Sequence, residues 1–167
     1  MEFLKLRILK NFSFLNFLII LFFFFYSFYV TKFQYDGHHI GLIYSNAIDL
    51  IKGRTPYKEI FIQYGFLTTL IHSLILLMFK SKVFFIIFFN LIFYSLAIYF
   101  ISQTVRNLTN TKFALISSVI ILFNHPIPWL PWSNYLAFFF ISISIFLLSK
   151  KNKHFLFIGF FKVLDWQ

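Results

Sequence analysis

The sequence predicts an all-α fold: a polytopic transmembrane helix bundle of about four or five spans plus an incomplete one, with an interfacial amphipathic helix in the first loop. Of the 167 residues, 60% are hydrophobic and 12% are charged, which is too apolar for a soluble domain of this size. Long uncharged runs separate the charged residues. We therefore expect a single membrane module over residues 1–167, with the lipid bilayer as its first partner.

The first span is predicted at residues 11–30, an uncharged run of about 20 residues, the length that crosses a hydrocarbon core as a helix. A basic head, residues 1–10, precedes it. The alternative is a signal peptide. The apolar run is longer than a usual signal core, and no small-x-small cleavage site precedes Lys32, so a membrane span is favoured.

A polar segment, residues 33–66, follows the first span, and its residues 33–64 are predicted as the first extracytoplasmic loop. It holds Asp36, Asp49 and Glu59, which are three of the five acidic residues in the chain. Two of the five histidines also lie in it. We expect any chemistry to be concentrated there.

The loop contains an amphipathic helix. Its apolar positions recur at helical spacing and are Ile40, Ile43, Tyr44, Ala47, Ile48 and Ile51. Polar positions fall mostly on the other side and are Ser45, Asn46, Asp49 and Lys52. Gly53 is a C-terminal stop signal, and Pro56 prevents the helix from continuing. Such a helix is expected to lie in the plane of the membrane interface.

Later spans are predicted from about residue 60 or 65 to 79, and at residues 83–101, 113–123 and 134–149. A polar loop is expected at 103–112, and a Pro-Trp loop at 125–132. The last apolar run, residues 155–164, is too short to cross, so we expect a truncated chain. His72 and Asn90 are expected to face neighbouring helices.

Basic residues give the chain a formal charge of +10. They stand mainly at the ends of apolar runs, where they meet anionic headgroups, so no nucleic-acid partner is expected. Five full spans would place the basic clusters on both sides of the membrane, against the positive-inside tendency. Either the chain is reversed in the membrane, or one apolar stretch between residues 65 and 123 is not a full crossing, and we favour the second alternative. The basic head, Arg106, Lys112 and the Lys150 cluster then share one side, opposite the polar segment.

Asp36 is the main candidate for chemistry. A carboxylate just after a span can take a proton from an attacking hydroxyl or bind a divalent cation. Asp36, His38 and His39 alone are a poor metal set, because adjacent side chains seldom converge on an ion without further ligands. The alternative is a solvated interfacial turn. Glu59 is expected to pair with Arg54 or Lys58 at the surface.

The order of motifs in the polar segment resembles the first extracytoplasmic loop of the GT-C glycosyltransferases. An aromatic residue, Asp36 and the amphipathic helix are followed by a G-x-x-P-Y pattern from Gly53 to Tyr57, and then by Tyr64-Gly65 at the start of a span. The likeness is greatest to bacterial members related to protein mannosyltransferases and aminoarabinose transferases. The chain would be the N-terminal portion of such a protein, in the bacterial inner membrane.

The resemblance implies sugar transfer from a polyprenyl-phosphate-linked donor to a hydroxyl, at a site on the extracytoplasmic face. Asp36 would be the catalytic base or a metal ligand. The expected substrate-binding residues are His38, His39, Arg54, Lys58, Glu59 and Tyr64, and Lys52 would be a further phosphate partner. The family's later acidic residue is missing from residues 125–135, and the chain is shorter than its members. A non-catalytic membrane protein, such as a transporter or an assembly subunit, is the competing hypothesis.

Overall fold

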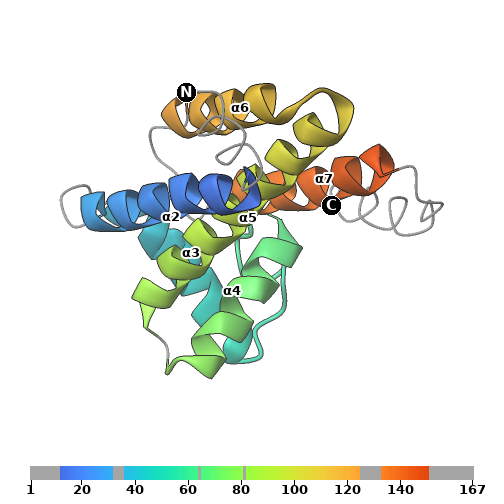
Figure 1. The fold of residues 1–167 in the computed structure, drawn as a ribbon. Coiled ribbons are helices and arrows are strands. Elements are labelled where there is room, and N and C mark those ends of the chain that lie inside the picture. Colours follow the sequence, from blue (N-terminus) through green and yellow to red (C-terminus); the bar gives the residue numbers. More distant parts are fainter. Residues whose placement is uncertain (1–11, 32–35, 64, 81, 125–132, 151–167) are drawn as a thin grey trace.

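The computed structural model describes residues 12–31, 36–63, 65–80, 82–124 and 133–150. They form helices α2 (Phe12–Val30), α3 (Gly37–Ile51), α4 (Phe66–Met78), α5 (Val83–Leu108), α6 (Thr111–Asn124) and α7 (Ser133–Ser149), drawn in Figure 1. No strand occurs in these residues beyond one isolated bridge between Pro56 and Ile60. The all-α prediction is therefore confirmed for the described part of the chain.

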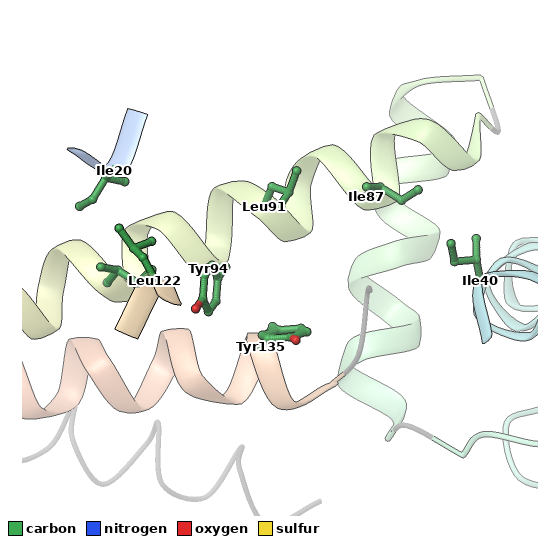
Figure 2. Packing of buried hydrophobic residues seen from close by; sticks show 8 residues of the cluster. Ile20, Ile40, Ile87, Leu91, Tyr94, Leu122 and Tyr135 are labelled. Carbon is green, nitrogen blue, oxygen red and sulfur yellow. The ribbon is translucent and has the colours of Figure 1, made fainter. Parts of the chain in front are cut away.

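Helix α5 organises the fold, because α2, α4, α6 and α7 all pack against it. Figure 1 shows α6 beside one end of α5, and α3 with α4 beside the other. Along α5, Ile87, Leu91 and Tyr94 belong to one buried cluster with Ile20 of α2, Ile40 of α3, Leu122 of α6 and Tyr135 of α7 (Figure 2). One helix thus carries the core that joins the other elements.

Helix α2 runs antiparallel to α5. The Phe28 ring lies 5.3 Å from that of Phe84 near the start of α5, and the Arg106 guanidinium near its end lies 4.8 Å above the Phe12 ring. The last turn of α2 is therefore close to the first turn of α5. The segment between α2 and α5, which contains α3 and α4, therefore leaves from and returns to the same end of the bundle.

Helix α6 is also antiparallel to α5. Ser102 Oγ donates to the Ala114 carbonyl over 3.1 Å, and the Tyr94 hydroxyl donates to the Ile121 carbonyl over 3.4 Å. Moving back along α5 therefore means moving forward along α6.

Helix α7 runs in the same direction as α5. The Tyr94 and Tyr135 rings lie 5.4 Å apart, and Asn107 Nδ2 donates to Ser149 Oγ over 3.0 Å. The start of α2, the end of α5, the start of α6 and the end of α7 hence share one end of the bundle, which we call the basic end for Arg106, Lys112 and Lys150. The sequence predicted that Arg106, Lys112 and the Lys150 cluster share one side of a membrane; the basic head and the Pro-Trp loop of that prediction lie outside the described residues, and the membrane sides stay a prediction.

The connection before α6 is shorter than predicted. The sequence placed a loop at 103–112, but α5 continues to Leu108, and the turn is confined to Thr109 and Asn110. One polar side chain near the end of α5 bonds to its own helix: Thr104 Oγ1 donates to the Phe100 carbonyl over 2.9 Å. A polar side chain that bonds in this way does not by itself end a helix.

Many large apolar side chains are exposed in this structure, and several polar side chains are buried between the helices. Helix α2 exposes seven large apolar or aromatic side chains: Phe14, Phe17, Leu18, Phe22, Phe25, Tyr26 and Tyr29. Buried polar side chains occur in α2, α5, α6 and α7 and include Asn16, Ser27, Asn90, Ser118 and Ser142. Asn16 and Ser118 are fully buried, and Ser118 Oγ donates to Asn16 Oδ1 over 2.8 Å.

Within the described residues, one helix, α5, is both long and apolar enough to cross a membrane. Helices α2, α4, α6 and α7 contain shorter apolar helical stretches. Helix α4 has 13 residues and is therefore about 20 Å long, against about 30 Å for a hydrocarbon core. The bounds predicted with the later start, 65 to 79, are matched to within one residue, because α4 begins at Phe66 and ends at Met78. The helix is nevertheless shorter than a full crossing needs.

Candidate functional site

Asp36 is the N-cap residue of α3. Its Oδ1 accepts a hydrogen bond from the His39 backbone N–H over 3.1 Å. Aspartate is among the preferred residues at this position because its side chain satisfies a backbone donor that the first helical turn leaves unpaired. The helix therefore starts one residue after the predicted catalytic carboxylate.

The same carboxylate binds the His39 side chain. His39 Nδ1 lies 2.5 Å from Asp36 Oδ2, and the two side chains are 36% and 37% exposed. The pKa of Asp36 is lowered, first by the His39 backbone N–H and then by the His39 imidazole. Since a carboxylate accepts only, Nδ1 must carry the proton in this pair. Asp36 is thus held as an ionised, oriented group that solvent can reach.

His38 lies beside this pair on the exposed side of α3. Its ring centroid is 5.3 Å from that of His39, with the two rings nearly perpendicular. Among the described residues, no group of three His, Asp or Glu side chains is placed to hold a metal ion. Metal binding by Asp36 stays a prediction.

At the other end of α3, Gly53 stops the helix as predicted, with a φ of +80°. The chain then folds back, and the Arg54 backbone N–H donates to the Asp49 carbonyl over 3.1 Å. That turn brings the Arg54 guanidinium to 3.1 Å from Asp49 Oδ2. The predicted pairing of Arg54 with Glu59 is therefore corrected: its ion-pair partner is Asp49, which the backbone turn places closer.

Glu59 stabilises the loop instead of forming the predicted ion pair. Its Oε2 accepts from the Thr55 backbone N–H over 2.7 Å, and that bond is the main reason why the pKa of Glu59 is lowered, with the charge of Arg54 adding to it. The Glu59 backbone N–H donates in turn to the Thr55 carbonyl over 2.9 Å. Lys58 is exposed in the same turn.

Asn46 is a residue that the sequence pattern misplaced. It was assigned to the polar side of α3, yet it is buried, and its Nδ2 donates to the Phe61 carbonyl over 2.7 Å. Its position three residues after Ile43 and one before Ala47 puts it at the edge of the buried face. That spacing was the available signal, but the partner lies 15 residues away.

The apolar face of α3 is covered by protein. Ile43 and Ala47 form a buried cluster with Leu76 of α4 and Ile86 of α5, and Tyr44, Ile48 and Ile51 pack against it. The predicted amphipathic helix is present, but its most buried residues contact neighbouring helices. The amphipathic pattern led us to expect that this face lies on lipid, but these residues of the face pack against protein.

The predicted site residues fall into two groups. Asp36, His38 and His39 lie at the start of α3, and the loop with Arg54, Lys58 and Glu59 follows its end. Asp49, which binds Arg54, is 13 residues beyond Asp36 and therefore about 20 Å along the helix axis. One small group cannot contact both. Tyr64 and the Pro-Trp loop at 125–132 lie outside the described residues.

His72 of α4 is deeply buried, and its Nδ1 has no hydrogen-bond partner among the described residues. The sequence predicted a bond to a neighbouring helix, and none is seen from this atom. No protein-family model, curated protein or solved structure matches the chain.

Proposed function

We propose that this chain is the membrane-embedded N-terminal part of a GT-C-type glycosyltransferase. The observation that carries the proposal is the half-exposed Asp36–His39 pair at the start of α3, placed at the end of an apolar helix bundle opposite its basic end. The ordered sequence motifs around it, from Asp36 to Tyr57, supply the link to this enzyme class.

A membrane location is supported by the outward apolar surface of α2 together with the buried polar side chains between helices. In water such a surface would be a large exposed apolar patch, whereas in a bilayer it would contact the lipid chains. In this arrangement α5 crosses the bilayer with the shorter apolar helices α2, α6 and α7 packed alongside it, and α3 and α4 enter and return on one side. The likeness of the sequence motifs to bacterial GT-C members supports the bacterial inner membrane as this membrane.

Orientation follows from charge. Arg106, Lys112 and Lys150 belong to helix ends that the contacts place together, and the positive-inside tendency puts them in the cytoplasm. Asp36 then faces the extracytoplasmic side. A lipid-linked sugar carried to the outer leaflet would be the donor at this face.

The chemistry needs a group that removes a proton from the acceptor hydroxyl. As the acceptor oxygen bonds to the anomeric carbon, its proton passes to the Asp36 carboxylate, and the bond from that carbon to the phosphate oxygen breaks, releasing polyprenyl phosphate. His39 holds the carboxylate in one orientation through Nδ1. The lowered pKa of Asp36 keeps the carboxylate ionised before the reaction, though it also makes a weaker base.

The test is sugar transfer from a polyprenyl-phosphate-linked donor by membranes that contain the protein. Asp36→Asn is expected to lower turnover by about 10²- to 10⁴-fold, the usual contribution of a general base. Asn can still accept the His39 backbone N–H, so the helix cap is largely retained. Unchanged turnover in Asp36→Asn would remove this mechanism.

The competing hypothesis, a transporter, would need a path of polar groups through the bundle. Many buried hydroxyls bond to carbonyls of their own helix: Ser142 Oγ donates to Phe139 and Ser144 Oγ to Phe140, over 2.7 and 3.0 Å. Such hydroxyls are typical of helix packing in membranes. Solute uptake by liposomes containing the protein would favour the transporter hypothesis over the glycosyltransferase hypothesis.

A further inference from the structure

The loop after α3, residues 52–63, holds two aromatic side chains away from the protein. Tyr57 is 65% exposed and Phe61 is 74% exposed. Their neighbours Ile60 and Ile62 are 3% and 8% exposed and anchor the loop inward. The loop therefore has a buried apolar side and an exposed aromatic side.

The exposed aromatic residues are held by a folded backbone. Tyr57 has a φ of +62°, an unusual conformation for a residue with a side chain, and its N–H donates to the Ile60 carbonyl over 3.1 Å. The Phe61 carbonyl is bound by the buried Asn46. Local strain at Tyr57 is thus supported by surrounding contacts, which also fix where both rings project.

Exposed basic residues accompany these rings. Lys52, Arg54 and Lys58 are all exposed, and Arg54 is partly neutralised by Asp49. Aromatic rings together with lysines that reach past them are typical of protein segments at the lipid headgroup level. Glu59 of the same loop is also exposed and ionised, so the loop keeps a smaller net positive charge, which is complementary to anionic lipid headgroups.

We propose that loop 52–63 docks onto an anionic lipid surface, with the Tyr57 and Phe61 rings among the headgroups and the Lys52 and Lys58 ammonium groups beside the lipid phosphates. Helix α3 does not fill this role, because its apolar face is covered by α4 and α5. The docking fixes the height of α3 relative to the bilayer. It rests on the proposed membrane location and is independent of sugar transfer.

The natural chain contains no cysteine, so a single introduced cysteine can carry a nitroxide spin label without further changes. The labelled sites are Tyr57→Cys and Phe61→Cys. The matched control is Thr55→Cys in the same loop, whose side chain is exposed. It keeps the backbone N–H that donates to Glu59 and loses only the hydroxyl contact to that carboxylate. Phe22→Cys on the exposed face of α2 is the reference for the bilayer interior.

The measurement is the collision rate of each label with oxygen and with a water-soluble nickel complex, in vesicles of phosphatidylcholine with phosphatidylglycerol. We expect the oxygen-to-nickel ratio at positions 57 and 61 to exceed that at 55 and to remain below that at 22. Ratios at 57 and 61 equal to the ratio at 55 overturn the docking. If the ratio at position 22 is still high in that case, α2 lies in the bilayer and the proposed membrane location is retained.

The role of charge is tested by repeating the measurement without phosphatidylglycerol, and with Lys52→Gln and Lys58→Gln combined. Either change is expected to lower the oxygen-to-nickel ratio at position 61. An unchanged ratio in both experiments would overturn the preference for anionic lipid.

Discussion

A single carboxylate, Asp36, both caps α3 and orients His39. One oxygen receives the backbone N–H and the other receives the imidazole N–H. The sequence could predict that Asp36 was special from its place just after a span, but it could not show that His39 would be the partner, because that depends on where the helix begins.

The lowered pKa of Asp36 predicts how this cap responds to acid. A carboxyl group with a folded pKa below the unfolded value stabilises the fold above the unfolded value, here about 3.8, and the contribution disappears as the pH falls through the lowered folded pKa. We expect the ¹³C carboxyl resonance of Asp36 to titrate below pH 3.8, and the His39 amide to lose its hydrogen-exchange protection over that same range. Titration at or above 3.8 would contradict the capped geometry.

The bond between Asn46 and the Phe61 carbonyl predicts a link between α3 and the loop. Asn46→Ala is expected to lower the free energy of unfolding by about 1 kcal/mol, the usual net value of one hydrogen bond. Trypsin cleavage after Arg54 and Lys58 should also become faster, because the loop loses an anchor. The measurements are denaturant unfolding in detergent and timed digestion.

Ser45→Ala is the matched control, since Ser45 is the exposed neighbour of Asn46 on the same helix. Equal cleavage rates in the Asn46→Ala and Ser45→Ala proteins would show that the bond does not hold the loop.

At the scale of elements, α3 shows what a helical pattern can and cannot predict. Its apolar spacing and its stop at Gly53 gave the helix correctly. The pattern could not show whether that face packs against lipid or against other helices of the protein, because both present an apolar surface. Leu76 and Ile86, from two later helices, cover it.

Two glycines give a conformational test of this element. Gly53 has a φ of +80° and Gly41 lies inside α3, and a methyl group would meet no atom within 4 Å at either position. Gly53→Ala is therefore expected to cost about 1 kcal/mol of unfolding free energy through the left-handed backbone alone. Gly41→Ala should instead stabilise by about 0.5–1 kcal/mol, because a helix interior favours alanine.

Thermal or denaturant unfolding of the two variants in the same detergent checks the pair. If both substitutions change the free energy of unfolding in the same direction, the proposed end of α3 at Gly53 is contradicted.

The arrangement of the whole molecule predicts which loops share a side. In vesicles of known orientation, a cysteine in place of Lys112 should react with an impermeant maleimide from the side opposite to one in place of Thr55. The reason is that α5 separates the start of α6 from α3 and α4. Reaction of both from one side would contradict the proposed crossing pattern.

Helix number and type could be predicted from hydropathy, but helix direction required contacts between distant residues. The Arg106–Phe12 and Asn107–Ser149 contacts place segments from the start and the end of the described chain together. Positive-inside reasoning had grouped Arg106, Lys112 and Lys150 from the sequence, but it could not indicate which residues of the helices meet. The extent of α5 past residue 103 was missed, because polar side chains can bond to their own helix.

The first turns of α5 have consequences for the order of assembly during synthesis. Contacts described there come from segments that leave the ribosome earlier: Phe24 and Phe28 of α2, Phe79 after α4, and the cluster with α3. The half of the bundle that carries Asp36 can therefore assemble as soon as α5 emerges. Helices α6 and α7 then join a partner whose other half is already in place.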